Sequence, residues 1–171
     1  MRHDELRDLL AAEMRHVVKH VVTEPELAPL TGETLARGAN VQDDARADIR
    51  ARGFWNRLQN AFFDIRVFYP HASSCLQRPL PNLYSSFETK KKREYNERVL
   101  HVDRGTFSPL VFSSTGGAGH EAECALKRLA LMLSEKRHEP YSVAMRLLRC
   151  RVSFALIRAT GHQNTTMQSN H

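Results

Sequence analysis

Hydrophobic residues recur along the first 70 residues at two different spacings, which predict helices and strands in turn. Apolar residues three or four positions apart predict an amphipathic helix over residues 3–20. A β-branched stretch at residues 21–23 predicts a short strand. Alternation at residues 45–53, and aromatic and β-branched residues at 61–69, predict two antiparallel strands of a hairpin.

The remaining pattern predicts three helices around one more strand. Helical spacing predicts helices over residues 85–102, 121–137 and 142–159, and a short apolar run predicts a strand over 108–114. Residues 25–43 contain proline, glycine and small polar residues, and they predict an irregular connection. The order helix, three strands, helix, strand, two helices predicts an α/β fold, with a small mixed sheet flanked by helices.

Length and composition predict one intracellular domain. The 171 residues suit a single domain, which we expect over residues 1–159, followed by a disordered tail over 160–171. No apolar run approaches the roughly 18–20 residues of a membrane span, so we expect no membrane partner. Cys75, Cys124 and Cys150 are odd in number and far apart, which favours reduced thiols in an intracellular protein.

The charge distribution favours a polyanionic partner. The net charge is +6, but residues 1–48 hold 6 basic and 10 acidic side chains, whereas residues 49–171 hold 19 basic and 9 acidic ones. The net charge of +10 over residues 49–171 suggests nucleic acid as the partner, because clustered cations attract phosphates. The alternative is a generic basic surface without a specific partner.

The aspartate in the strand at 61–69 is the most informative single residue. Asp64 lies in an apolar, aromatic stretch, where an unpaired carboxylate is costly. The hairpin places Asp48 across the ladder, where two like charges destabilise each other. A divalent cation would resolve that conflict, since carboxylates suit Mg²⁺ or Mn²⁺. The alternative is an ordinary ion pair of Asp64 with Arg66, Arg46 or Arg50.

The two aspartates carry a family resemblance. Asp48, followed after fifteen residues by Asp64-Ile65-Arg66, resembles the D…(D/E)xK core of the PD-(D/E)xK nucleases, whose fold is restriction-endonuclease-like. In that family a glutamate on the first helix often joins the site, and Glu5 stands in the corresponding place. The family's order of helix, three strands, helix and strand also agrees with the elements predicted here.

A second set of motifs narrows this resemblance. Residues 2–5 (RHDE) resemble the (R/K)HN-type start of the endonuclease domain in site-specific non-LTR retrotransposon proteins. Residues 90–95 (KKKREY) resemble the KxxKY-type motif of those domains, with Lys91 four residues before Tyr95. The sequence of residues 44–70 resembles that of animal proteins of transposon origin. The likeness covers about residues 1–158.

The resemblance implies a Mg²⁺- or Mn²⁺-dependent endonuclease of retroelement origin, which would cleave phosphodiester bonds of DNA in the nucleus. Glu5, Asp48 and Asp64 would hold the metal, and Lys91 or Arg66 would stabilise the charge that develops on the phosphate. The residues expected to contact the DNA backbone are Arg46, Arg50, Arg52, Lys90, Lys92 and Arg93.

Departures from the family pattern favour an alternative function. The sequence has Ala47-Asp48 where the family has Pro-Asp, and Arg66 where it has lysine. Arginine keeps the charge, but its planar guanidinium serves poorly as a point charge. The upstream zinc motif of the retrotransposon enzymes is not in this sequence. The alternative is a catalytically inactive module of the same fold that binds nucleic acid or a protein.

Other motifs have plainer interpretations. The Gly-rich residues 116–119 (GGAG) could bind a phosphate, but a flexible turn is the better interpretation without a following Gly-Lys-Ser/Thr. His16 and His20 are four residues apart, and we expect them to be exposed rather than to bind zinc. Phe54 and Trp55 are expected to pack rather than to stack on a nucleotide.

Overall fold

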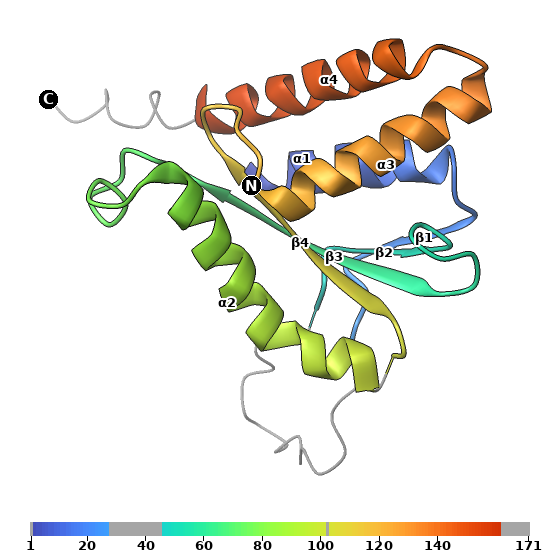
Figure 1. Cartoon of the computed structure of the whole chain (residues 1–171), viewed down its shortest axis with the longest axis horizontal. Coiled ribbons are helices and arrows are strands. Elements are labelled where there is room, and N and C mark those ends of the chain that lie inside the picture. Colours follow the sequence, from blue (N-terminus) through green and yellow to red (C-terminus); the bar gives the residue numbers. More distant parts are fainter. Residues whose placement is uncertain (1, 28–45, 102, 162–171) are drawn as a thin grey trace, which may run out of the picture.

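A computed structural model describes residues 2–27, 46–101 and 103–161, and shows a mixed α/β fold with an open four-stranded sheet (Figure 1). The elements follow one another in the predicted order. They are α1 (Arg2–Arg15), β1 (His20–Thr23), β2 (Ile49–Arg52), β3 (Asn60–Phe68), α2 (Leu80–His101), β4 (Thr106–Ser113), α3 (His120–Arg137) and α4 (Tyr141–Gly161).

The strands lie in the order β1-β2-β3-β4, and the sheet is mixed. β1 pairs with β2, and β2 with β3, in antiparallel fashion, which confirms the predicted hairpin. β3 pairs with β4 in parallel, and α2 forms the crossover connection that parallel neighbours need. β3 therefore has a neighbour on both sides, and its nine residues form the centre of the sheet.

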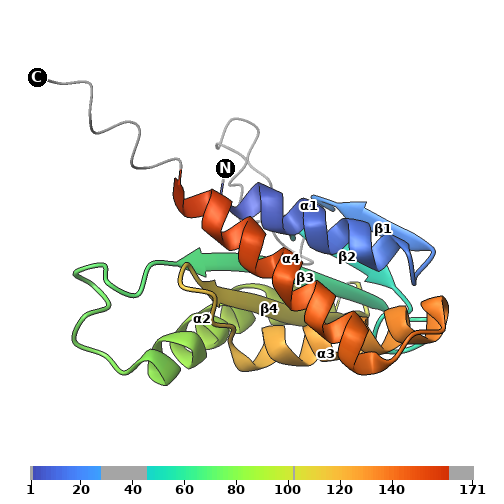
Figure 2. The same cartoon turned by 90° about the horizontal axis from the view of Figure 1, so that it is seen from above.

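Helices cover both faces of the sheet, and the alternation of β3 decides what each covers. Phe63 and Ile65 pack in the large core with α1, α3 and α4. Phe62 and Phe68 pack on the opposite face, under α2. Figure 2 shows α4 crossing the sheet on the side away from α2. A polar side chain of β3 on the Phe62 face therefore points toward α2.

β2 is shorter than the predicted strand, and this difference shapes the site. The ladder stops at Ile49, and the backbone N–H of Asp48 donates to the carbonyl of Phe63 at 2.9 Å. Ala47 then packs with Phe62, under α2, instead of sharing a face with Ile49 as strict alternation predicts. The side of the sheet that alternation predicts for Ala47 is wrong, because Ala47 precedes β2 and does not belong to the strand.

Three further boundaries differ from the sequence prediction. α1 ends at Arg15 instead of residue 20, because His16 and Val17 donate to carbonyls three residues back and close the helix in a tight turn. α2 begins at Leu80 instead of residue 85. α4 extends through Gly161, into the segment predicted as a tail. Residues 28–45 and 162–171, with most of the predicted connection and tail, lie outside the described residues.

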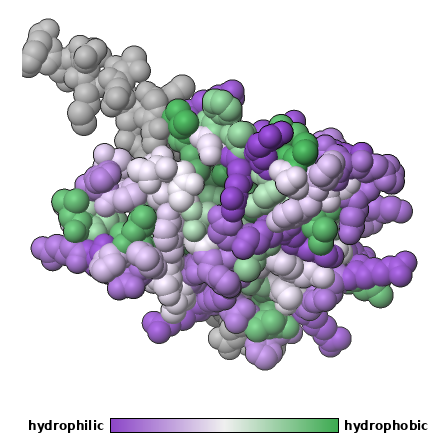
Figure 3. All heavy atoms as spheres, turned by 45° about the horizontal axis from the view of Figure 1, so that its top comes forward, coloured by the Kyte–Doolittle hydropathy of each residue, from purple (hydrophilic) through white to green (hydrophobic). Residues whose placement is uncertain are grey.

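The face of the molecule in Figure 3 is mainly hydrophilic, with separate groups of hydrophobic side chains, one of them beside the end of α4. None of the described helices is both long enough and apolar enough to cross a membrane. The three cysteines are free thiols.

Candidate functional site

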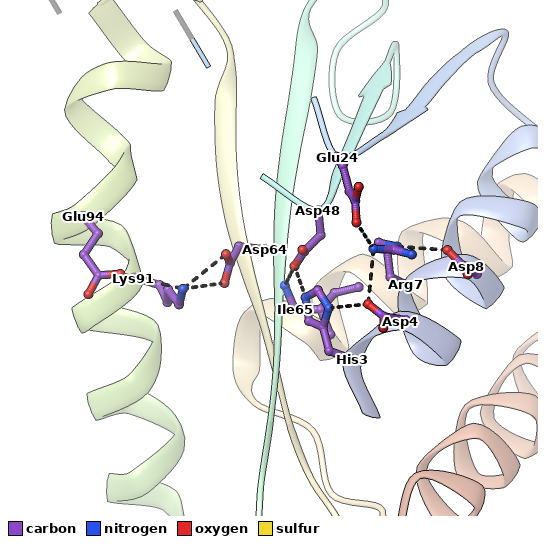
Figure 4. Close-up of polar contacts among 10 residues, drawn as sticks. All are labelled: His3, Asp4, Arg7, Asp8, Glu24, Asp48, Asp64, Ile65, Lys91 and Glu94. Atoms are coloured by element: carbon purple, nitrogen blue, oxygen red, sulfur yellow. Dashed lines mark hydrogen bonds and ion pairs between the residues drawn. The ribbon is translucent and has the colours of Figure 1, made fainter. Parts of the chain in front are cut away.

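Asp64 lies near the middle of β3 and points toward α2, where Lys91 meets it (Figure 4). Asp64 is only 5% exposed. The Nζ of Lys91 lies 3.2 Å from both carboxylate oxygens and donates a hydrogen bond to Oδ1. The other oxygen, Oδ2, is buried and accepts no hydrogen bond. Asp64 is therefore an ionisable group in the core with one of its two oxygens left without a hydrogen bond.

Lys91 is held against the sheet by the aromatic residue one turn further along α2. Its Nζ lies 5.1 Å from the centre of the Tyr95 ring, and Tyr95 is buried against Phe107 of β4 with ring centres 5.2 Å apart. Glu94 lies 3.7 Å from the same ammonium. The Lys91–Tyr95 spacing of the sequence motif thus directs the lysine inward to Asp64.

The environment of Asp64 raises its pKa from 3.8 to about 6. Burial is the main cause, because it penalises the charged form, and the negative charge of Asp48 adds to it. The positive charge and hydrogen bond of Lys91 act in the opposite direction and do not compensate. The carboxylate is consequently a site where additional positive charge would be favourable.

Asp48 immediately precedes the first residue of β2, and its side chain bonds to the backbone of β3 where β2 no longer pairs with it. Its Oδ2 accepts a hydrogen bond from the backbone N–H of Ile65. The Nε2 of His3, from the first turn of α1, lies 2.6 Å from the same oxygen. That contact raises the pKa of His3 above its usual value, and burial of the imidazole opposes the shift. The β2–β3 register ends at the first residue of β2, and the Asp48 N–H donates to the Phe63 carbonyl, so Asp48 does not pair across the ladder with Asp64, contrary to the prediction. Its negative charge nevertheless acts on Asp64.

Two of the predicted site residues do not join these aspartates. Glu5 lies on the exposed side of α1, and His3 reaches Asp48 instead. The guanidinium of Arg66 lies 4.0 Å from the centre of the Phe87 ring on α2. The predicted alternative, an ion pair of Asp64 with an arginine, is therefore wrong in its partner, which is Lys91.

His3 is the residue of this site that sequence reasoning missed. It stands inside the quoted RHDE segment, two residues before Glu5, and helical geometry turns those two positions to different sides of α1. The available signal was the helix start itself, because the first turn of α1 lies beside Asp48, the residue that precedes β2.

Two carboxylates, those of Asp48 and Asp64, are the groups of this region with the chemistry that a divalent cation needs. Across residues 2–27, 46–101 and 103–161, no three His, Cys, Asp or Glu side chains gather in an arrangement that would hold a metal ion. The Oδ2 of Asp64, buried without a hydrogen bond and near a second carboxylate, is nevertheless the kind of oxygen that Mg²⁺ accepts as a ligand. Asp48 and Asp64 are the residues that could hold such an ion.

The residues predicted to contact DNA do not form one surface: some lie on the sheet, and others form ion pairs with acidic side chains. Arg50 pairs across the ladder with Phe62, so it lies on the α2 side of the sheet, and alternation places Arg52 there also. Lys92 forms an ion pair with Glu121 of α3, and Arg46 lies 3.3 Å from Glu26.

Lys90 and Arg93 lie on the outer face of α2 and line a polar trough of about 730 Å³. The other residues of the trough are Arg78, Asn82, Ser85, Ser86, Thr89 and Glu94. Their hydroxyl, amide and cationic groups are those that proteins use to contact phosphates. The predicted DNA contacts of Lys90 and Arg93 therefore have a suitable surface around them.

The Gly-rich turn before α3 is packed against α2 and leaves no room for a phosphate. The Oε1 of Glu88 accepts a hydrogen bond from the backbone N–H of Glu121 at 3.1 Å, at the start of α3. A Cβ atom at Gly119 would overlap that carboxylate oxygen. A carboxylate of the chain itself therefore occupies the place where a phosphate would bind.

The predicted packing of Phe54 and Trp55 and the predicted exposure of His16 and His20 are confirmed. Phe54 is fully buried, and the indole N–H of Trp55 donates to the hydroxyl of Ser108 at 3.2 Å, so this pair packs the hairpin onto the core. His16 and His20 are both exposed.

The site thus unites Asp48, Asp64, Lys91 and His3 at the point where β2 ends and β3 continues. Each residue comes from a different part of the fold: the end of β2, β3, α2 and the first turn of α1. Comparison of the chain with protein-family models, with curated proteins and with solved structures found no match.

Proposed function

We propose that this chain is a metal-dependent DNA endonuclease domain of restriction-endonuclease-like fold and retroelement origin. The observation that carries the proposal is the unbonded, buried Oδ2 of Asp64, beside the negative charge of Asp48 and within reach of Lys91. The order αβββαβαα, with both aspartates at the β2–β3 junction, supports the same fold type. It also agrees with the resemblance of the motifs.

In this function Asp48 and Asp64 would hold Mg²⁺ or Mn²⁺. The bound cation would polarise the scissile phosphate and lower the pKa of a water molecule. Lys91 would place its ammonium next to the phosphate and stabilise the negative charge that develops during hydrolysis. With a pKa of about 6, Asp64 is mostly ionised above pH 7, so cleavage should require neutral or alkaline conditions.

A second candidate is an inactive module of the same fold that binds nucleic acid. The observation that favours it is the occupation of Asp48: its Oδ2 already receives the Ile65 N–H and His3. Arg66, which stands where the nuclease family has lysine, contacts Phe87 and not the aspartates. Both features reduce the number of groups free to serve a metal or a phosphate.

Nicking of supercoiled plasmid DNA separates the two candidates. The full chain should convert supercoiled DNA to the open circle with Mg²⁺ or Mn²⁺, and chelation by EDTA should stop the reaction. An inactive module would shift the plasmid in a gel under the same conditions without nicking it. Binding without any metal-dependent nicking, at any pH from 6 to 9, would decide for the inactive module.

DNA binding is expected to be independent of sequence and to weaken with salt. Each phosphate contact of a cation releases condensed counterions and contributes about 0.9 to the slope of log affinity against log salt. The double change Lys90→Gln/Arg93→Gln removes two cations from the α2 trough. We therefore expect fluorescence anisotropy to show a slope smaller by about 1.8 in the variant.

The matched control is Lys127→Gln/Lys136→Gln, which removes the same charge from exposed positions of α3. These residues lie on a helix that packs against the other face of the sheet. The control should retain most of the wild-type slope. Equal slopes for the two double variants would show that α2 has no special part in binding.

A further inference from the structure

The outward side of α4 carries a stripe of apolar residues that no other described element lines. Tyr141, Cys150, Phe154 and Ile157 lie exposed along a groove of about 570 Å³, which the buried core residue Met145 also lines, and all of its lining residues belong to α4. Phe154 is 62% exposed and Tyr141 is 43% exposed. The hydrophobic group beside the end of α4 in Figure 3 belongs to this side of the molecule.

The inner side of the same helix is already buried. Leu148, Val152 and Leu156 pack in the main core with α1 and α3. A helix that is apolar on both sides is the type that proteins bury between two partners. The outer stripe spans sixteen residue steps, or about 24 Å, which suits contact along several helical turns.

The charge of α4 restricts what can cover the stripe. The helix carries four arginines and no acidic residue. Arg151 turns toward Glu13, and Arg149 contacts Glu123 at 2.9 Å while its side chain remains 54% exposed. Arg146 lines the groove and forms no ion pair with another described residue. The groove is therefore apolar along its length and cationic at its margin.

This charge argues against a second copy of the chain as the partner. In a two-fold symmetric contact each α4 meets the same surface of its mate. The stripe is centred near Arg149 and Cys150, so either orientation brings arginine toward arginine. A nucleic acid would supply negative charge, but it would leave the exposed Phe154 and Ile157 against a polar backbone.

From these observations we infer that α4 is a docking surface for an acidic amphipathic helix of another protein. The partner's apolar residues, at spacings of three and four, would fill the groove beside Phe154. Its acidic residues would lie against Arg146 and Arg149, where charge complementarity selects the partner. This inference does not depend on the proposed nuclease activity, because it uses no residue of the Asp48–Asp64 site.

Two synthetic helical peptides test the inference by fluorescence anisotropy with the full chain. Both are about 18 residues long, enough to span about 24 Å, and carry leucines at helical spacing. One has glutamates at the flanking positions, and the other has lysines there. The glutamate peptide should bind at least about tenfold more tightly. Phe154→Ser should weaken its binding about tenfold, because an exposed aromatic anchor is lost.

A charge reversal excludes simple misfolding as the cause. Arg146→Glu should weaken binding of the glutamate peptide and strengthen binding of the lysine peptide. The control is Leu58→Ser, which changes an apolar residue that is 79% exposed on the β2–β3 hairpin, and it should leave both affinities unchanged.

Other outcomes would overturn the inference. Equal affinity for the two peptides, no binding of either, or no effect of Phe154→Ser would show that α4 does not select an acidic helix. Self-association in sedimentation equilibrium that Phe154→Ser abolishes would assign the groove to a second copy. Oligonucleotide binding that is lost in the same variant would assign it to nucleic acid. Plasmid nicking by the α4 variants should equal the wild-type rate, so the two proposals fail separately.

Discussion

Asp64→Asn is expected to abolish Mg²⁺-dependent DNA cleavage and, without metal, to stabilise the fold above pH 7. Asparagine keeps the shape of the aspartate but cannot supply the negative oxygen that a cation needs. The same change removes a buried negative charge whose cost exceeds what Lys91 returns, as the raised pKa of about 6 shows. One substitution thus separates catalysis from stability, with effects of opposite sign.

The pH dependence follows from the direction of the shift. The folded-state pKa of Asp64 is about 6, and the ordinary value is 3.8, so the folded protein binds more protons between these pH values. The contribution of Asp64 to the unfolding free energy therefore falls as pH rises from 4 to 7, by on the order of 2–3 kcal/mol. Below pH 4 the variant and the wild type should differ little, and above pH 7 the variant should be more stable.

Urea unfolding at a series of pH values measures this difference, and Lys91→Gln provides the opposite case. Without the ammonium at 3.2 Å, the carboxylate keeps its burial but loses its cation, so Lys91→Gln should destabilise the protein at pH 8. Asp8→Asn changes a largely exposed carboxylate on α1 and should leave the pH profile as it is.

If Asp64 binds a metal, the wild type and Asp64→Asn should also differ in their response to Mg²⁺. Addition of Mg²⁺ should raise the melting temperature of the wild type, because binding to the folded state stabilises it, and should not raise that of Asp64→Asn. If Asp64→Asn loses stability at pH 8, and Mg²⁺ leaves the wild-type melting temperature unchanged, then Asp64 is a structural partner of Lys91 and the metal site does not exist.

Local periodicity predicts those features of the site that depend on one element at a time. The alternation of β3 is enough to place Asp64 on one face. The four-residue spacing of Lys91 and Tyr95 is enough to place the lysine on the buried side of α2. Because both elements are long, small errors at their ends do not alter which side chains point inward.

The features that were missed depend on where elements end and on distances between side chains. β2 stops at Ile49, and no periodicity within residues 45–53 marks that point, so the position of Ala47 was predicted wrongly. The choice of His3 over Glu5 depends on the angle at which α1 meets the end of β2. Arg66 shares a face with Asp64, yet its guanidinium lies over the ring of Phe87, which packs against Phe68 further along β3.

Glu13→Ala is expected to cost about 2–3 kcal/mol of unfolding free energy, because it removes a buried carboxylate that accepts charge-assisted hydrogen bonds. Glu13 lies on the inner side of α1 and is only 3% exposed. Arg137 of α3 donates to its Oε2 at 3.1 Å, and Arg151 of α4 contacts its Oε1. The carboxylate therefore joins α1 to two helices that are distant from it in sequence, α3 and α4, and alanine leaves two guanidinium groups without their shared anion.

Urea unfolding at pH 7 measures this cost, and Glu24→Ala is the matched control. Glu24 also contacts an arginine, Arg7, but its side chain is 56% exposed, so its loss should cost less than about 1 kcal/mol. In the double variant Glu13→Ala/Arg151→Ala the total cost should be smaller than the sum of the single costs, because one unpaired charge is removed with its partner. Strict additivity, or a cost of Glu13→Ala no larger than that of Glu24→Ala, would show that packing alone holds α1, α3 and α4 together.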